Sequence, residues 1–258
     1  MHMLLFPQMF YQERLRNTSF FKFLELNDIP GFMHLVTCRS SSVATSDDNG
    51  LNEGEAPENN LLKSLGVEYD QLIFLHQTHS NRVVFFPENL SADSQNLATQ
   101  SADGVITTAR GQFPVIQTAD CLPILIVSPE ERRLCMVHAG WRGTRDRIII
   151  NGLKQFLKST RVDSQELIVA LGPAIRQCCY EVGPEIRDQY EDQGHESTCL
   201  FTGNHFDLVQ ANINQIREFG ISQIIDAGIC TACRTDLFYS YRKEGETGRM
   251  WTVAGFFP

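Results

Sequence analysis

The sequence predicts an α+β fold, because apolar strand-like runs dominate its order and helical periodicity comes late and irregularly. Residues 123–127 and 134–137 are near-continuous apolar runs, as expected of strands buried on both faces. A helical stripe follows over 143–158. No internal repeat is found, and the mixed order of elements argues against a regular doubly wound fold.

Short apolar or alternating segments bounded by turn residues are expected to form strands. The expected strands are 20–26, 34–37, 72–75, 82–86, 103–107, 113–117, 123–127, 134–137, 166–171, 221–226 and 250–256.

Helices are expected at three places, together with one short helical turn at 61–65. Over 143–158, the apolar residues Ile149, Leu153, Phe156 and Leu157 recur with helical spacing. The other two helices are a mostly polar one at 184–192 and one at 208–219, with Asp207 as its cap and Gly220 after its end.

The remaining segments fit one domain over 1–258. Residues 1–11 are apolar but lack a basic start and a cleavage site, which indicates a packed arm rather than a signal peptide. Residues 40–60 are polar and acidic, which predicts a mobile loop, and a long loop inside a domain is often a lid or a binding loop.

Composition limits the partners of this chain. It has 258 residues, 42% hydrophobic, and a net charge of −9 without a block of lysines and arginines, which argues against binding to nucleic acid or an anionic membrane. No apolar run is long enough to span a bilayer. The eight cysteines are expected to be reduced thiols in the cytoplasm.

Cys121 and His138 each stand at the end of an apolar run, which suggests a reactive or metal-binding site. A catalytic zinc takes three protein ligands and leaves one position open. His79, which follows another expected strand, is the best candidate for the third ligand. His76 lies three residues earlier, and on an extended chain an odd separation places two side chains on opposite faces, so the two histidines are not expected to share one ion. From spacing alone, satisfied structural residues remain the favoured alternative.

The segment that follows His138 has the features of an anion-binding turn. Gly140 and Gly143 allow a tight turn into a helix, where free amides and the guanidinium of Arg142 favour an anion such as phosphate. A plain turn with a solvated arginine is at least as good an interpretation. Asp120, beside Cys121, is either an orienting residue, a proton carrier or a turn residue.

The C-x-x-C motif at Cys230 and Cys233 has no second C-x-x-C to complete a zinc site, so a reduced, partly buried pair is favoured. The adjacent Cys178 and Cys179 are likewise expected to be packed thiols rather than a disulfide.

Several motifs, in order, resemble the YfiH-type family, long described as polyphenol oxidases or multicopper laccase-like proteins and now regarded as purine nucleoside enzymes. The matching segments are Q-T-H at 77–79, A-D-G-V-I-T at 102–107, T-A-D-C-L-P at 118–123, H-A-G-W-R-G at 138–143, L-G-P-A-I at 171–175, C-Y-E-V-G at 179–183, C-T at 230–231, S-Y-R at 240–242 and G-R-M at 248–250.

The resemblance implies a single-domain αββα-type layered sandwich with mixed sheets. It implies a zinc site, phosphorolysis of adenosine, inosine, guanosine and methylthioadenosine, and deamination of adenosine. It places the metal ligands at His79, Cys121 and His138. One departure from the family lies at 40–52, which lacks the usual glycine pair and bears on substrate preference.

The expected site joins this resemblance to the reasoning from the residues. The catalytic candidates are His79, Asp120, Cys121 and His138, and the substrate-binding candidates are Arg39, Gln77, Gly140, Arg142 and Arg242. The expected partners are purine nucleosides and phosphate, and the oligomeric state stays open.

Three alternatives remain. A His₂Cys set also suits copper in an electron-transfer centre, although a multicopper laccase needs about ten histidine ligands and this chain has seven histidines. In the second alternative, Cys121 is a nucleophile activated by His138, and the protein is a hydrolase that acts on peptidoglycan precursors, as some relatives suggest. In the third alternative, the chain is a non-enzymatic binding module.

Overall fold

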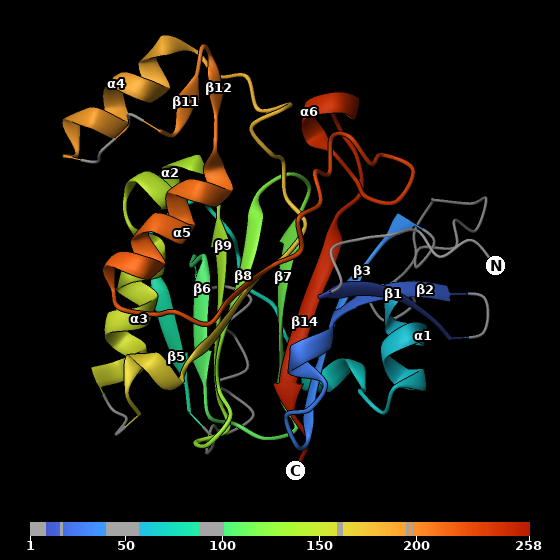
Figure 1. The fold of residues 1–258 in the computed structure, drawn as a ribbon. Coiled ribbons are helices and arrows are strands. Elements are labelled where there is room, and N and C mark those ends of the chain that lie inside the picture. The colour runs from blue at the N-terminus through green and yellow to red at the C-terminus, as the bar shows by residue number, and fades with distance from the viewer. Residues whose placement is uncertain are drawn as a thin grey trace.

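The fold is built on two six-stranded sheets stacked face to face (Figure 1). The computed structural model describes residues 9–15, 18–39, 57–87, 101–158, 162–194, 197 and 199–258. The first sheet has the order β1 (Phe10–Leu15), β2 (Thr18–Phe23), β3 (Phe32–Thr37), β14 (Met250–Phe256), β7 (Phe113–Thr118) and β4 (Leu72–Ile73). Its pairs are antiparallel except for β4 with β7.

The second sheet is mixed in the same way. Its order is β13 (Ile224–Asp226), β10 (Ile168–Leu171), β8 (Leu122–Ser128), β9 (Arg133–Ala139), β6 (Gly104–Thr107) and β5 (Val83–Phe86). The outer pairs, β13 with β10 and β5 with β6, are parallel, and the inner pairs are antiparallel.

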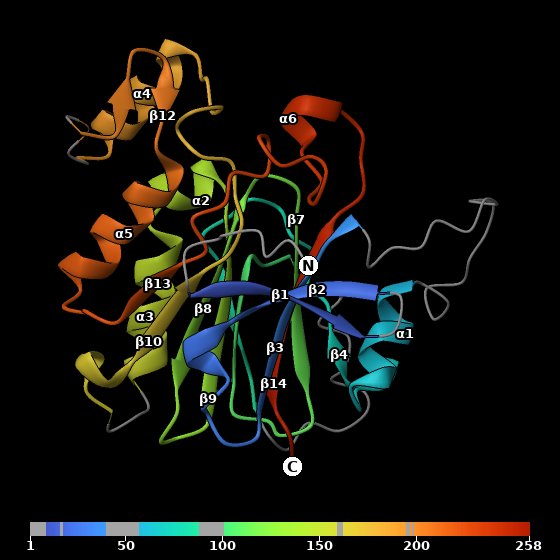
Figure 2. The same cartoon turned by 45° about the vertical axis from the view of Figure 1, so that its right-hand side comes forward.

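Helices cover the outer faces of both sheets, which gives the four layers of an αββα sandwich (Figures 1 and 2). The second sheet carries α2 (Trp141–Arg145), α3 (Ile148–Lys158) and α5 (Leu208–Glu218), and the first sheet carries α1 (Pro57–Ser64). At one end of the molecule lie α4 (Pro184–Asp192), α6 (Tyr241–Glu244) and the hairpin of β11 (Phe201–Thr202) and β12 (His205–Phe206).

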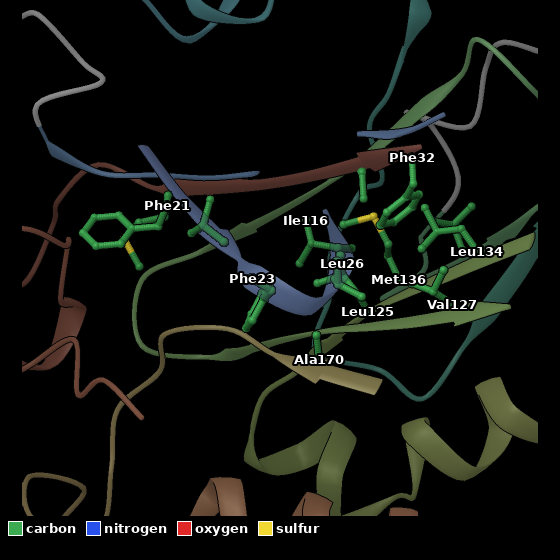
Figure 3. Packing of buried hydrophobic residues seen from close by; sticks show 14 of the residues in the cluster. Phe21, Phe23, Leu26, Phe32, Ile116, Leu125, Val127, Leu134, Met136 and Ala170 are labelled. Carbon is green, nitrogen blue, oxygen red and sulfur yellow. The ribbon is translucent and has the colours of Figure 1, made fainter. Parts of the chain in front are cut away.

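Three apolar cores correspond to the three contacts between layers. The middle core joins the two sheets, with Phe21 and Phe23 of the first facing Leu125 and Met136 of the second (Figure 3). A second core joins the second sheet to α3 and α5, and a third joins the first sheet to α1. Strands with apolar cores on both faces have no polar face, which explains their continuous apolar sequence.

The expected αββα fold is confirmed, and its boundaries differ in places. The expected helix 143–158 is two helices, because Arg147 adopts a left-handed backbone with a φ of 59° between them. The expected strand 20–26 ends at Phe23 and continues as a 3₁₀ turn over Leu24–Leu26. The strand β1, which begins at the end of the expected arm, was not predicted.

The prediction for 40–60 is wrong in its last residues, because α1 begins at Pro57. Proline suits the first turn of a helix, and Leu61 and Leu62 of α1 are buried on the first sheet. Residues 40–56, including the departure at 40–52, lie outside the described part of the chain, as do 1–8. Within the described residues, no helix combines the length and apolarity needed to cross a bilayer.

Strand register brings distant residues to one end of the second sheet. In the β8–β9 hairpin Pro123 pairs with His138, so Cys121, just before β8, lies near the end of β9. Gly104 of β6 pairs with Val137 of β9, and the backbone N–H of His138 donates to the carbonyl of Asp103 at 2.6 Å. Three chain segments therefore meet where the site is expected.

Candidate active site

His79, Cys121 and His138 form one cluster, with their candidate ligand atoms all within 4.8 Å of one another. His79 lies in the turn between β4 and β5, Cys121 precedes β8, and His138 belongs to β9. The His79 and His138 rings meet edge to face, with 4.8 Å between centroids. The structure thus brings together the three side chains that spacing and resemblance singled out.

Asp103 organises this cluster, although sequence reasoning assigned it no role. Its carboxylate is fully buried, and Oδ1 lies 2.8 Å from Nδ1 of His138. The same carboxylate accepts hydrogen bonds from the backbone N–H groups of His79 at 2.9 Å and Ser80 at 2.6 Å. Asp103 therefore fixes one histidine ring and the turn that carries the other. The signal in the sequence was its place in the motif A-D-G-V-I-T, just before an expected strand, while the pairing of that strand with the strand of His138 is visible only in the structure.

Backbone strain concentrates at the same place. His79 has a φ of 59° and Asp120 a φ of 91°, values that non-glycine residues rarely adopt. The backbone N–H groups of His79 and Ser80 donate to the carboxylate of Asp103, which holds His79 in this conformation. Strained residues held by their surroundings are typical of functional sites.

The charges of the cluster are coupled. Burial would raise the pKa of the Cys121 thiol, but the charge of His138 and hydrogen bonds from both histidines lower it to about 6. Burial would lower the pKa of His138, but Cys121 and Asp103 raise it to about 9. Burial also acts to raise the pKa of Asp103, and hydrogen bonds from His138 and Ser80 outweigh it and hold that pKa well below its ordinary value. Without a metal, the pair is thus a thiolate beside an imidazolium at neutral pH.

The donor set fits a metal ion. The hydrogen bond at Nδ1 leaves Nε2 of His138 for a ligand, and a carboxylate behind a histidine is the usual support of a metal-binding imidazole. Two imidazoles and one thiolate suit zinc with an open fourth position. A blue-copper centre favours a weak axial methionine, and none occurs among the described residues that line the pocket.

Gly140 closes the cluster from one side. A Cβ atom at this position would lie 3.0 Å from Cδ2 of His79 and 3.1 Å from Sγ of Cys121. Any larger residue would push on two of the three candidate ligands. Gly140 is the N-terminal cap of α2, which has only five residues.

The cluster opens into a cavity of about 590 Å³, a size typical of small-molecule sites. The lining combines cationic and aromatic side chains with a few apolar ones. The arginines, tryptophan and tyrosines of the lining are Arg142, Arg242, Arg249, Trp141, Tyr180 and Tyr241. Arg249 and the three aromatic residues had no assigned role from the sequence.

Asp120 ties two late loops to the pocket. Its Oδ1 accepts a hydrogen bond from the Thr231 hydroxyl at 2.6 Å, and Oδ2 accepts one from the backbone N–H of Arg242 at 2.7 Å. Both carboxylate oxygens are thus engaged. These bonds go to the two loops rather than to His79, Cys121 or His138, so the catalytic role of Asp120 stays a prediction.

Two other expected substrate residues have structural partners. The side-chain amide of Gln77 lines the pocket and makes two 2.8 Å hydrogen bonds with the backbone of Gln117. Arg39 is not among the pocket-lining residues; its guanidinium pairs with Glu244, stacks over Tyr239 and donates to the carbonyl of Phe238. Its substrate-binding role stays a prediction.

Comparison with known proteins places this architecture among relatives. The family described as multi-copper polyphenol oxidoreductase laccase matches residues 39–256. The chain is 32% identical over 191 residues to a purine nucleoside phosphorylase of Haemophilus influenzae, covering 71% of this chain and 74% of that protein. It is 32% identical over 205 residues to adenosine deaminase RL5 of an unknown prokaryotic organism, covering 74% and 78%.

Solved structures agree on the fold. YfiH of Bacillus licheniformis superposes with a TM-score of 0.81 at 22% identity, covering 94% of this chain and 98% of that one. YlmD of Geobacillus stearothermophilus gives 0.79 at 24% identity, covering 98% and 100%. The chain therefore belongs to the YfiH-type family, whose family model carries the description multi-copper polyphenol oxidoreductase laccase.

Proposed function

We propose that this protein is a zinc-dependent purine nucleoside enzyme. Its reactions would be phosphorolysis of adenosine, inosine, guanosine and methylthioadenosine, and deamination of adenosine. The observation that carries the proposal is the cluster of His79, Cys121 and His138 in a cavity with arginines and aromatic rings in its wall. The names of the relatives, purine nucleoside phosphorylase and adenosine deaminase, supply the substrate class.

His79, Cys121 and His138 would hold the zinc, with Asp103 fixing the orientation of His138. A bound zinc supplies Lewis acidity for water activation or for polarising a substrate oxygen. Gly140 would serve by leaving room for two of the ligands rather than by contacting substrate.

The arginines suit the phosphate. In phosphorolysis a phosphate oxygen forms a bond to the anomeric carbon of the ribose, and the base leaves with the electron pair of the broken glycosidic bond and takes a proton. Arg142 and Arg249 are exposed at the pocket and offer fork-shaped donors for an anion. The amides of residues 140–143 begin too short a helix to be given this task, so the proposal for phosphate rests on the side chains.

The aromatic residues suit the base. Tyr180 is half-buried in the wall of the pocket and Trp141 flanks it. Arg242 lies over the Tyr180 ring and Arg142 over the Trp141 ring, so a purine would stack on a remaining face of either ring or displace an arginine. Adenosine deamination needs water to add at C6 and ammonia to leave, so the base would have to reach the cluster. Phosphorolysis instead places the ribose nearest the phosphate.

The test is incubation of protein of known metal content with each nucleoside, with and without phosphate, followed by identification of the products. Free base and ribose 1-phosphate (methylthioribose 1-phosphate from methylthioadenosine), formed only with phosphate, support phosphorolysis, and inosine formed from adenosine supports deamination. Full activity in protein stripped of metal would contradict the zinc requirement. A blue absorption band in the purified protein would favour the copper alternative.

One observation favours a second candidate. In the metal-free state Cys121, His138 and Asp103 form a thiolate, imidazolium and carboxylate in series, which is the arrangement of a cysteine hydrolase. Such an enzyme, acting on peptidoglycan precursors, would lose activity on thiol alkylation and keep it in the presence of a chelator. The zinc enzyme would respond to the chelator.

A further inference from the structure

Two cysteine pairs that are far apart in the sequence meet at one point outside the pocket. The Sγ atom of Cys233 lies 3.6 Å from that of Cys178 and 3.3 Å from that of Cys179, and 3.9 Å separates Cys178 from Cys179. With Cys230, all four Sγ atoms lie within 4.8 Å of one another. The sequence holds no second C-x-x-C, and the structure supplies the second pair from two cysteines that are adjacent in sequence rather than spaced.

We infer that this chain has a structural zinc site made of four thiolates: Cys178, Cys179, Cys230 and Cys233. A tetrahedral zinc with Zn–S bonds of about 2.3 Å has ligand sulfurs about 3.8 Å apart. The measured separations of 3.3, 3.6 and 3.9 Å surround this value. Each thiol releases its proton to solvent when it binds the ion.

The backbone around Cys230 is arranged for a thiolate. The backbone N–H of Arg176 donates to Sγ of Cys230 at 3.4 Å, and the N–H of Cys233 also donates to this sulfur. Amide donors to a sulfur stabilise its negative charge and are a common outer support of metal-bound cysteine.

Both pairs lie on turns whose backbones are already fixed. Ala174 bridges to the Cys230 segment, since its N–H donates to the carbonyl of Ile229 and its carbonyl accepts from the N–H of Thr231. Backbone hydrogen bonds to the carbonyl of Arg176 close the turn through Cys179, and one to the carbonyl of Cys230 closes the other. Metal binding would therefore order little additional chain.

The position suggests what the ion would do. Tyr180, next to Cys179, lines the pocket, and Thr231, next to Cys230, donates to Asp120. A zinc here would fasten two loops behind the wall of the pocket. All four protein ligand positions are filled, so the site would have no open place for a substrate, as in structural zinc sites.

The test measures zinc per chain after purification under reducing conditions, loading with zinc and removal of the free ion. The variant Cys233→Ser should hold one zinc fewer than the wild type, whereas Cys199→Ser, which removes an exposed cysteine outside the cluster, should match the wild type. His79→Ala should retain the zinc that Cys233→Ser loses, so the outcome does not depend on the proposed activity. Equal zinc in Cys233→Ser and the wild type overturns the site, and iron at this position overturns the choice of zinc.

A second measurement uses the wild-type chain, in case the variant fails to fold. Zinc added to the reduced protein should slow alkylation of Cys178 and Cys233, read by peptide mass mapping, and leave that of the exposed Cys199 unchanged. Equal labelling of Cys178 and Cys233 with and without zinc would overturn the inference.

Discussion

Nδ1 of His138 lies 2.8 Å from Oδ1 of Asp103, and both side chains are buried at the end of the second sheet. The carboxylate accepts rather than donates, because its pKa is held well below the ordinary value. The imidazole proton is therefore expected on Nδ1, which leaves Nε2 free for a ligand. This contact joins the strand of one candidate ligand to the turn of another through a single side chain.

Asp103→Asn should weaken zinc binding about 10- to 100-fold, because the amide keeps the shape but loses the charge that orients and polarises His138. It should also lower the free energy of unfolding by about 3 kcal/mol, since a buried charge-assisted network is broken. Competition with a chromogenic chelator and urea unfolding measure the two effects. Asp70→Asn, at an exposed position, is the control and should change neither.

Gly140→Ala should reduce zinc affinity by about 10-fold or more while the fold is kept, because the new methyl group would displace His79 or Cys121. Gly152→Ala is the matched control, since its Cβ would meet neighbours at ordinary distances of 3.4 Å and beyond in the middle of α3. Circular dichroism checks the fold, and metal titration checks the site. Wild-type affinity in Gly140→Ala would show that the cluster adapts to the added atom.

Metal-free protein should be alkylated at Cys121 at neutral pH, because the neighbouring His138 lowers the pKa of this thiol to about 6. The rate should fall as the pH drops through about 6, where the thiolate takes up its proton. His138→Asn should move this midpoint upward, since the positive charge is lost. Cys135, whose pKa is raised by burial, should stay unmodified throughout, and zinc should protect Cys121.

Arg142→Ala should raise the KM for phosphate in nucleoside phosphorolysis by about 10- to 100-fold, because the phosphate loses the binding free energy of a hydrogen bond to a charged group. The KM for the nucleoside should change much less. Arg187→Ala, which removes an arginine that stacks on Phe201 away from the pocket, serves as the control. An unchanged dependence on phosphate would remove Arg142 from the proposed site, and the same experiment on Arg249 would then locate the anion.

Much of the fold follows from local sequence. The strand Met250–Phe256 and the helix Pro184–Asp192 agree with their expected ranges, because apolar continuity marks the strand and Pro184, after Gly183, marks the start of the helix. The left-handed break at Arg147 was hidden, since the apolar stripe continues through it. Of the helix α1 only the last turn was predicted, because its first turn is polar, whereas Leu61 and Leu62 pack on the first sheet.

Some residues of the site could likewise be predicted from the sequence, and others could not. Cys121, His138 and His79 all stand at the ends of runs that apolar patterning marks, and the family motifs pointed to the same three residues. Asp103 was hidden because its role depends on pairing between β6 and β9, which no local pattern specifies. Cys179 and Cys233 are 54 residues apart in the chain, and only the meeting of two turns makes them neighbours.

The central position of β14 has a consequence for how this protein is made. Residues 250–256 lie between β3 and β7, so the two halves of the first sheet are joined only through this strand. On the ribosome, β3 and β7 emerge long before their shared neighbour and expose unpaired edges in the meantime. Completion of the sheet must wait until this late strand leaves the exit tunnel. A nascent chain stalled before residue 250 would be a ready partner for other chains and a natural client for chaperones.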